Sequence, residues 1–375
     1  MSLKHRAYGF IFNLFRIFPV KDNSISFVSD KNESFNDDFR YIYREFKKLK
    51  QNPKFSYNYI IKNKISINNI YKLARSNYIF LNDNFFPLAY MNISDKTKVI
   101  QLWHGAGGFK KFGYSTTLKD GKDLINLIRK SSNNTDYLFI TSKNYKKDFM
   151  EAFQIDDNKI YPLGMARLDY FAPENLKKEN ILKIKSKFEK TYPGINNKKI
   201  ILYAPTFRET TEYNNIFKYF DINKFIDNLS DEYVLFLRLH PRMYQFTQDN
   251  NLIYEALKLN NVYDLTDYES IEELMLISDI LITDYSSLMV EYTILDKPII
   301  LFAYDLDNYL ECERGFYIDY KKDVPGTIVK TTDELINTIK NENFNTDRLE
   351  EFKNLQFDNL DGKASRRIVE FVLNH

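Results

Sequence analysis

Histidine and glycine are scarce in this chain of 375 residues, and their positions are the first sign of chemistry. There are four histidines and eleven glycines, and five of the glycines fall between residues 105 and 121, directly after His104. A second histidine, His240, lies between Arg238 and Arg242 in the run RLHPR. Imidazoles move protons near neutral pH, and arginines pair with phosphate. The two clusters therefore indicate proton transfer on an anionic substrate.

The glycine-rich run WHGAGGFKKFG follows a predicted strand at 98–103. A dinucleotide fingerprint needs glycine at the sixth position counted from Gly105, and that position is Lys110. The fingerprint also needs a strand that ends in an acidic residue about 20 residues further on. The segment 120–130 is predicted to be helical instead, so we exclude NAD binding. The run instead predicts a loop that holds an acceptor substrate closely, with His104 as proton acceptor; an ordinary glycine-rich turn is the alternative. Its residues are Trp103, Gly105, Gly107, Gly108, Lys110 and Lys111.

Two further runs place cationic side chains at the ends of predicted strands. Thr206 and Arg208 follow the strand 199–205, where Pro205 can end the ladder. Strand alternation puts Arg238 and His240 on one side of the strand 233–239. Nearby positive charge favours a neutral imidazole that donates to a phosphoryl oxygen. A strand-end charge cluster paired with acids is the alternative interpretation.

The run TDYSSLMVE ends one predicted strand, 279–283, and begins a helix. Serine and aspartate are good helix N-caps, so a well-capped helix alone would explain them. The functional interpretation is that free amides and hydroxyls hold phosphate oxygens at the helix start. Glu291 lies four residues after Ser287, on the same face, where it could reach ribose hydroxyls. The residues concerned are Thr283, Asp284, Ser286, Ser287 and Glu291.

Apolar runs of strand length alternate with segments of helical length, which is the pattern of stacked βα units. The length favours two domains, with a Pro/Gly/Asn cluster in YPGINN near their boundary. We therefore predict an α/β protein with two Rossmann-like parallel-sheet domains that face a central cleft. The predicted strands lie at 24–29, 55–61, 77–82, 98–103, 137–142 and 158–163 in the first domain, and at 199–205, 233–239, 261–265, 279–283 and 298–303 in the second.

Composition excludes several other classes of protein. The formal net charge of +2 gives no argument for a nucleic-acid partner. The 44% share of hydrophobic residues excludes disorder of the whole chain. A single cysteine, Cys312, excludes an intrachain disulfide and a cysteine metal cluster. No apolar run reaches the length of a spanning helix, and no cleavage site of a signal peptide follows the N-terminal run.

Residues 1–22 form a predicted amphipathic segment in which aromatic and aliphatic side chains stand among Lys4, Arg6, Arg16 and Lys21. One interpretation is an interfacial helix on the surface of an anionic membrane, contacted through residues 4–21. The other is an ordinary helix that packs on the domain.

Taken in order, WHGAGGFKKFG, YAPTFR, RLHPR, TDYSSLMVEY and DGKAS resemble the CDP-glycerol glycerophosphotransferase family of teichoic-acid primases and polymerases. The resemblance covers about residues 20–370 and implies the GT-B arrangement. It implies an acceptor domain at 23–172, a nucleotide-donor domain at 173–363 with a linker helix at 174–190, and a helix at 364–375 that crosses back to the first domain. It also implies a peripheral protein at the cytoplasmic face of the cell membrane.

Carried over to this chain, the resemblance makes His104 and His240 essential for activity. It assigns the donor pyrophosphate loop to Thr283, Asp284, Ser286 and Ser287, and a second donor-side loop to Asp361, Gly362, Lys363 and Ser365. The implied reaction transfers an alditol phosphate, with glycerol phosphate favoured over ribitol phosphate, from a CDP-alditol to a hydroxyl of a lipid-pyrophosphate-linked acceptor and releases CMP. No cofactor is required by the sequence, and no metal ligands are assigned, although Mg²⁺ stays open.

Two alternatives share much of this evidence. A GT-B glycosyltransferase that uses a nucleotide sugar would have the same fold and phosphate loop. A non-catalytic nucleotide-binding α/β protein would bind the nucleotide without releasing CMP. Histidines after strands in both domains argue against the binding protein. The sequence does not name the alditol, the acceptor, the number of units added or the oligomeric state.

Overall fold

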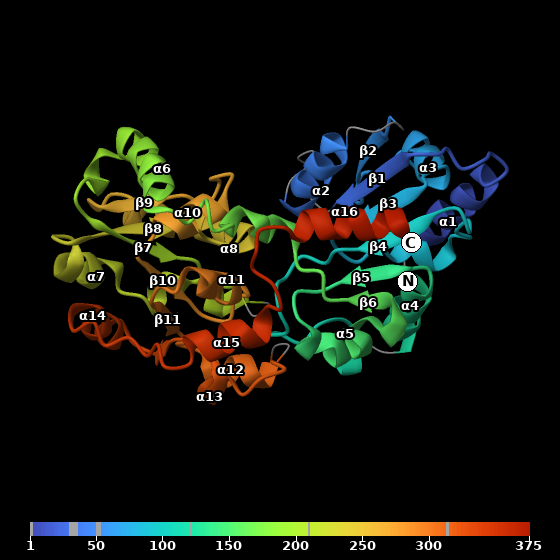
Figure 1. Cartoon of the computed structure of the whole chain (residues 1–375). Helices are drawn as coiled ribbons and strands as arrows, with labels where there is room; N and C mark the ends of the chain where they lie inside the picture. Colours follow the sequence, from blue (N-terminus) through green and yellow to red (C-terminus); the bar gives the residue numbers. More distant parts are fainter. Residues whose placement is uncertain (1–2, 30–36, 50–53, 120–121, 209–210, 313–314) are drawn as a thin grey trace. The chain divides into compact units, whose positions relative to one another are not determined.

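The chain folds into two compact units, shown in a computed structural model that describes residues 3–29, 37–49, 54–119, 122–208, 211–312 and 315–375 (Figure 1). The first unit comprises residues 1–172 and 355–375, and the second comprises residues 173–354. Each contains a six-stranded sheet whose paired strands are all parallel. The predicted α/β class with two parallel sheets is therefore confirmed.

The sheet of the first unit has the strand order β2-β1-β3-β4-β5-β6. All six residues of β1 are buried, which is typical of a parallel sheet covered on both faces. The strands are β1 (Ser24–Ser29), β2 (Ser56–Ile61), β3 (Tyr78–Leu81), β4 (Lys98–Gln101), β5 (Tyr137–Phe139) and β6 (Ile160–Tyr161). The helices are α1 (Leu3–Phe15), α2 (Asp37–Lys48), α3 (Ile67–Ala74), α4 (Lys122–Asn133), α5 (Lys146–Phe153) and α16 (Ala364–Asn374).

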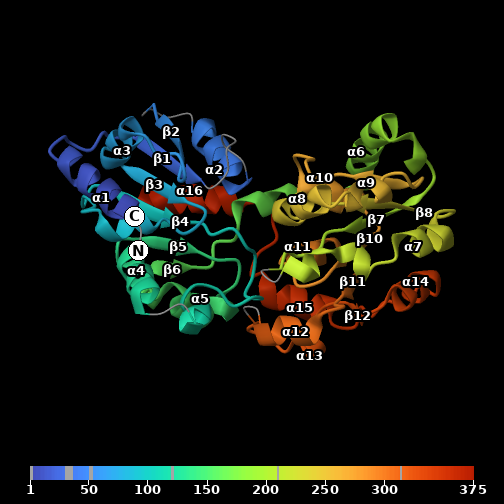
Figure 2. The same cartoon turned by 180° about the vertical axis from the view of Figure 1, so that it is seen from behind.

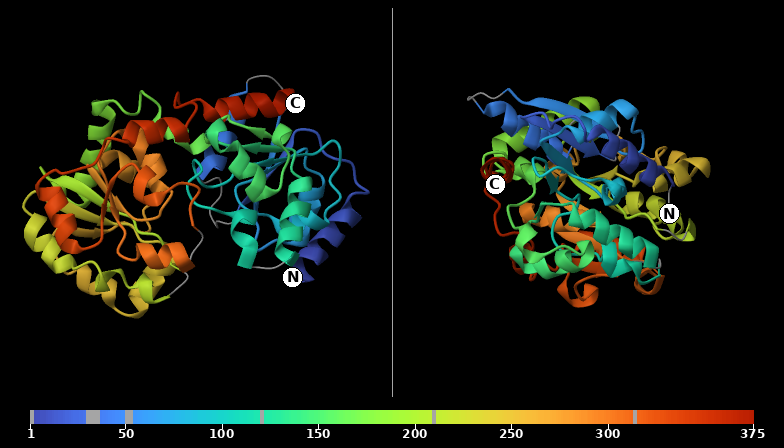
Figure 3. Two further views of the ribbon diagram at one scale, coloured as in Figure 1. Left: turned by 90° about the horizontal axis from the view of Figure 1, so that it is seen from below. Right: turned by 90° about the vertical axis from the view of Figure 1, so that its right-hand side faces the viewer.

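Alternation along β1 divides the core of this unit into two layers. Phe27 packs with α2 and α16 on one face of the sheet. Its neighbour Val28 packs with α1 and α3 on the other face. Figure 3 shows α1 and α16, which carry the two chain ends, on opposite faces of this sheet. The C-terminal helix therefore completes the core of the first unit.

The sheet of the second unit has the strand order β12-β11-β10-β7-β8-β9. Its apolar core joins alternate residues of the central strands to α7 and α14, which Figure 2 shows from behind. The strands are β7 (Lys199–Tyr203), β8 (Tyr233–Leu237), β9 (Val262–Asp264), β10 (Ile280–Thr283), β11 (Ile299–Phe302) and β12 (Thr327–Val329). The helices are α6 (Lys178–Thr191), α7 (Ile222–Leu229), α8 (Pro241–Asp249), α9 (Leu252–Ala256), α10 (Ile271–Ile277), α11 (Leu288–Tyr292), α12 (Leu306–Cys312), α13 (Tyr320–Asp323), α14 (Thr332–Lys340) and α15 (Leu349–Gln356), the last of which runs through the division between the units.

Every predicted strand overlaps an observed one, and the differences have local causes. The strand predicted at 98–103 ends at Gln101, because the Gln101 side chain accepts a hydrogen bond from the Trp103 amide and Trp103 has a φ of 61°. The edge strand β12 has only three residues and was not predicted. The helix predicted at 120–130 begins with two residues outside the described ranges, and α4 continues to Asn133.

Candidate active site

The order of strands in the second unit places the predicted donor residues at one edge of its sheet. The chain runs outward from β7 through β8 to β9, then returns to β10 on the other side of β7. A parallel sheet binds ligands outside the carboxyl ends of its strands at such a reversal. The loops that follow β7 and β10 meet there, and the loop that follows β8 lies beside them.

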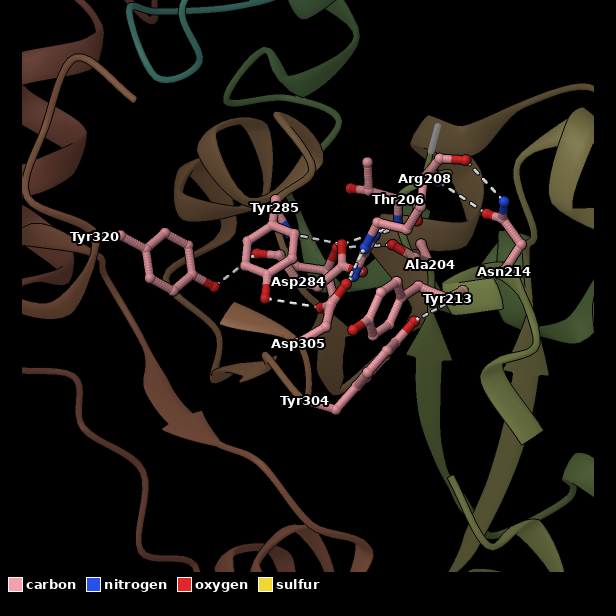
Figure 4. Close-up of polar contacts among 11 residues, drawn as sticks. Ala204, Thr206, Arg208, Tyr213, Asn214, Asp284, Tyr285, Tyr304, Asp305 and Tyr320 are labelled. Carbon is pink, nitrogen blue, oxygen red and sulfur yellow. Dashed lines mark hydrogen bonds and ion pairs between the residues drawn. The ribbon is translucent and has the colours of Figure 1, made fainter. Parts of the chain in front are cut away.

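Arg208 lies at the centre of this edge, where it joins the loops after β7, β10 and β11 (Figure 4). Its side chain is 1% exposed. Nε and Nη2 contact the two carboxylate oxygens of Asp305 at 2.6 and 2.9 Å, and Nη2 also lies 2.9 Å from Oδ2 of Asp284. Asp284 Oδ1 in turn accepts hydrogen bonds from the Thr206 and Tyr285 amides at 2.8 and 2.6 Å. The cluster thus ties three loops together.

Aromatic rings surround the guanidinium of Arg208. The rings of Tyr285, Tyr304 and Tyr309 have their centroids 4.7, 5.4 and 5.3 Å from its carbon, within cation–π range. Burial alone would lower the pKa of Arg208, but the neighbouring carboxylates outweigh it and raise that pKa well above its ordinary value. In this structure the guanidinium is buried and holds the loops in place, so the predicted capture of phosphate by Arg208 stays a prediction.

Thr283 and Asp284 have the same scaffolding character. Thr283 is buried, and its hydroxyl donates to the Ala204 carbonyl at 2.7 Å. Asp284 is also buried, with its carboxylate turned to Arg208 and to backbone amides (Figure 4). Neither side chain is open to a ligand in this structure, and their predicted contact with the donor stays a prediction.

The other predicted residues of this loop region differ in how accessible they are. Thr206, Ser286 and Ser287 are half-buried. The Thr206 hydroxyl has no hydrogen-bond partner within the described part of the chain, whereas Ser286 Oγ accepts from the Leu288 amide at 3.2 Å. Glu291 in α11 is 2% exposed, so its carboxylate lies inside rather than toward a ribose. The Thr206 hydroxyl oxygen is itself buried, so it is not open to a phosphate oxygen in this structure.

His240 stands exposed at the end of β8, where it caps helix α8. Its Nδ1 accepts a hydrogen bond from the Arg242 amide at 3.2 Å, so the proton of the neutral ring is on Nε2. The Phe207 ring stacks on the imidazole with centroids 5.5 Å apart, and Arg242 lies over that phenyl ring. One nitrogen of Arg238 is engaged with the carbonyls of Leu265 and Tyr268. His240 and Arg242 are therefore the outward-facing members of the predicted anion site.

His104 lies at the end of β4 in the first unit, with its side chain 56% exposed. The Trp103 indole packs against the imidazole, with ring centroids 4.1 Å apart. The carboxylate of Asp83, which follows β3, lies 3.7 Å from His104 Nδ1. Arg167 donates a hydrogen bond to the His104 backbone carbonyl at 3.1 Å. The imidazole is thus held from several sides and remains accessible to a substrate.

The glycine loop after His104 is shaped by close packing. A side chain at Gly108 would place a Cβ atom 2.0 Å from the Tyr145 ring, so only glycine fits there. The Gly107 and Gly108 amides donate to Thr141 and Gln356 side chains at 3.0 and 3.1 Å. These amides therefore serve the fold of the loop. Gly105, Lys110 and Lys111 are half-buried in the same loop.

The segment Asp361–Ser365 folds with the first unit, where it begins α16. Asp169 accepts hydrogen bonds from the Ala364 and Ser365 amides at 2.7 and 2.9 Å, and Asp361 forms an ion pair with Arg367. At Gly362, with φ at +69°, a Cβ atom would lie 2.4 Å from that of Ala172. The prediction that residues up to 363 belong to the donor domain is corrected, since 355–363 join the first unit; Lys363 only precedes the helix and is exposed.

Helix α1 packs through Phe12 yet leaves large apolar side chains exposed. Phe10 and Leu14 in this helix are 66% and 54% exposed, and Ile17, two residues after its end, is 81% exposed. Within the described residues, no helix combines the length and apolarity needed to cross a bilayer. Across the described ranges, His, Cys, Asp and Glu side chains do not gather in groups of three that could hold a metal ion.

Three residues of these sites were missed from the sequence: Asp83, Arg167 and Asp305. Asp83 and Asp305 each come within two residues of the end of a predicted strand, at 77–82 and 298–303. A search of every predicted strand end for polar residues would have found both. Arg167 has no comparable signal, because it lies in a 3₁₀ helix, Ala166–Phe171, and reaches His104 only through the fold.

The two Rossmann-like sheets, with polar residues at their carboxyl edges, define an α/β protein of the GT-B class. A family model described as CDP-Glycerol:Poly(glycerophosphate) glycerophosphotransferase matches residues 10–374. The chain belongs to this family.

Relatives of known name agree with this membership. The chain is 34% identical over 385 residues to the teichoic acid poly(ribitol-phosphate) polymerase of Bacillus spizizenii. The alignment covers 99% of this chain but only 60% of the relative's length. It is also 34% identical over 320 residues to the teichoic acid glycerol-phosphate primase of Bacillus subtilis, with 84% and 78% of the two chains covered.

A solved structure of a variant of the wall teichoic acid polymerase TagF aligns with a TM-score of 0.80 at 26% identity. The alignment covers 99% of this chain and 92% of that one. The same variant has also been solved after soaking with CDPG, with a TM-score of 0.78.

Proposed function

We propose that this protein transfers an alditol phosphate from a CDP-alditol to a hydroxyl of a lipid-linked acceptor and releases CMP, in the synthesis of teichoic acid or a related polymer. The family match over residues 10–374 is the observation that carries the proposal. The names of the relatives support the teichoic-acid assignment, and the TagF structure soaked with CDPG supports a CDP-linked donor.

The proposed reaction is a displacement at the β-phosphorus of the donor. The acceptor oxygen forms a bond to that phosphorus, the bond to the bridging oxygen breaks, and CMP leaves with its electron pair. A new phosphodiester remains on the acceptor. Such transfers depend on positioning and on stabilisation of charge more than on covalent catalysis.

His240 is proposed to stabilise the pyrophosphate charge. Because its Nδ1 accepts the Arg242 amide, its Nε2–H points away from that bond and is available to donate to a phosphoryl oxygen. Arg242, which is exposed beside it, would add a positive charge. Arg208 and Asp284 would contribute indirectly, since they fix the loop that carries Thr206.

His104 is proposed as the general base that removes the acceptor proton. Its exposed ring and its place at the end of β4 suit that role. General bases of this kind accelerate reactions by about 10²–10⁴-fold. His104→Ala and His240→Ala should therefore each lower CMP release by on the order of 10²-fold. Full turnover by both variants would contradict the assignment.

The alditol of the donor is not decided by these relatives. The ribitol-phosphate polymerase and the glycerol-phosphate primase are both 34% identical to this chain, over 385 and 320 residues. The sequence prediction that favoured glycerol therefore stays a prediction. The two donors differ in the length of the alditol chain, and direct competition between them for CMP release decides between them.

We also propose that α1 rests on the anionic surface of the cytoplasmic membrane, which supports peripheral attachment at that face. Exposed apolar residues of α1 and of the turn that follows it stand among Lys4 and Arg16, as an interfacial segment requires. Changing Phe10 and Ile17 to serine should reduce co-flotation with vesicles of phosphatidylglycerol. The control is Leu182→Ser in α6, which removes a leucine that is 50% exposed and should float as the wild type does. Equal flotation of all three proteins would contradict the proposal.

A further inference from the structure

The imidazole of His104 is bordered by a carboxylate that the proposed reaction has not yet used. Asp83 comes directly after β3, the neighbour of β4 in the sheet, so the two side chains emerge from adjacent strand ends. Asp83 Oδ1 lies 3.7 Å from His104 Nδ1. The side chain of Asp83 is 23% exposed, less than half the exposure of the imidazole.

Asp83 is itself held in place by three contacts. Its Oδ2 forms an ion pair with Lys62, which follows β2. Its Oδ1 accepts a hydrogen bond from the Asn84 amide at 2.7 Å, and its backbone carbonyl accepts one from the Gln101 side chain at 3.3 Å. Because strands β2, β3 and β4 all contribute, the carboxylate has a fixed position beside the imidazole.

The rest of His104 is also immobilised, so Asp83 faces a defined edge of the ring. Trp103 covers one face of the imidazole, and the Trp103 ring is packed against Phe112 and Phe153. Arg167 holds the His104 carbonyl and bonds through its own backbone amide to Asp38. Nδ1 is turned toward Asp83, so Nε2 is the ring nitrogen on the side away from this carboxylate.

We infer that Asp83 is a positioning residue that sets the protonation and orientation of His104. This inference rests on the proposed role of His104 as general base. A carboxylate opposite Nδ1 favours the tautomer with the proton on Nδ1, and it leaves the lone pair on Nε2. The separation of 3.7 Å is within ion-pair range but longer than a hydrogen bond, so the inference requires the two groups to move closer when substrate binds.

The proton balance of this step is simple. The acceptor hydroxyl gives its proton to Nε2 of His104 as its oxygen bonds to the β-phosphorus. The imidazole then carries one positive charge, which faces the negative charge of Asp83. The carboxylate stabilises that charge and does not itself take the proton, as in carboxylate–histidine pairs generally. Lys62 forms an ion pair with the carboxylate and holds it in place.

The test compares Asp83→Asn with Lys62→Met and with the control Asp95→Asn, which neutralises an exposed aspartate of the same unit. Nitrogen NMR of ¹⁵N-histidine-labelled protein reports which imidazole nitrogen carries the proton, and the His104→Asn variant assigns the signal. Asp83→Asn should shift His104 away from the Nδ1–H tautomer, whereas Lys62→Met and Asp95→Asn should retain it.

Activity gives the second readout. With the donor that the wild type uses and a synthetic lipid-pyrophosphate-linked acceptor, Asp83→Asn should lower kcat by on the order of 10²-fold, with little change in the donor KM. Lys62→Met should lower kcat less, because the carboxylate remains. If Asp83→Asn does not fold, Asp83→Glu keeps the charge and should preserve the tautomer.

An unchanged tautomer and unchanged kcat in Asp83→Asn would overturn the inference. Equal losses in Asp83→Asn and Lys62→Met, with the tautomer intact in both, would also overturn it, because they would show a purely structural ion pair. The variant His104→Ala tests the proposed function separately. If it releases CMP at the wild-type rate, His104 is not the general base. The NMR comparison would still decide whether Asp83 orients His104.

Discussion

Replacing Arg208 with methionine should destabilise the second unit rather than merely weaken donor binding. Its guanidinium is the cation that faces the buried carboxylates of Asp284 and Asp305, at 2.6 to 2.9 Å. Methionine preserves much of the side-chain volume and removes the charge. Two carboxylates would then be buried without that partner, in a site that excludes water.

The expected magnitude follows from this geometry. Removing one partner of a buried ion pair costs about 3–5 kcal/mol, because the remaining charge is left without compensation. Here two carboxylates lose the same partner, and three tyrosine rings lose their cation–π contact. A loss of about 3 kcal/mol lowers the Tm of a unit of this size by roughly 6–12 °C.

Thermal unfolding, followed by circular dichroism, measures this effect. The matched control is Arg242→Met, which removes an exposed arginine at the same edge of the sheet and should change stability by less than about 0.5 kcal/mol. Arg208→Met combined with Asp284→Asn and Asp305→Asn should recover part of the lost stability, because the neutral amides carry no unpaired charge. If Arg208→Met unfolds at the wild-type temperature and only raises the donor KM, Arg208 is a phosphate ligand and the reasoning fails.

Three further predictions concern other parts of the chain. Burial lowers the pKa of Lys297 from 10.5 to about 8 in the folded protein. Its full contribution to the free energy of unfolding is therefore present above pH 10.5, and that contribution is lost as the pH falls toward 8. Between about pH 8 and 9.5, the unfolding free energy of the wild type should therefore rise by about 1.5 kcal/mol relative to that of Lys297→Met. Urea titrations measure this, and a difference between the two proteins that stays constant with pH would contradict it. Gly108→Ala should lower the Tm by several degrees, because the new Cβ would meet the Tyr145 ring at 2.0 Å; an unchanged melting curve would show that the loop relaxes freely. We propose that no resident metal is required, so CMP release should survive prior treatment with EDTA and gel filtration, and complete loss restored by Mg²⁺ would refute this.

Hydrophobic patterning was sufficient to predict most of the fold. The β1 segment SISFVS is buried along its whole length, and a short run of this kind between turn signals is what a parallel sheet predicts. Strand β12 was missed because three residues at a sheet edge carry almost no periodic signal. The C-terminal helix was found from its apolar spacing, but its start at Ala364 depends on the Asp169 side chain, which is distant in sequence.

The candidate site was predicted less completely, for a physical reason. The types of residue at the ends of predicted strands indicate where polar groups gather. They correctly locate His240 and Arg208 at one edge of the sheet. They do not show which side chains turn inward. Arg208 is sealed by Asp284 and Asp305, and the latter lies 97 residues away in the sequence. Such a partnership is set by tertiary structure, so the sequence could not separate a scaffold arginine from a phosphate ligand.

The central claim is tested most directly by measuring CMP release from a panel of donors. The panel contains CDP-glycerol, CDP-ribitol and a UDP-sugar, each incubated with the full chain and a lipid-pyrophosphate-linked acceptor, with the product mass read by mass spectrometry. We predict CMP release from one or both CDP-alditols and a product heavier by one or more alditol phosphates. Release of UDP from the sugar donor alone, or binding of a CDP-alditol with no CMP released, would contradict it.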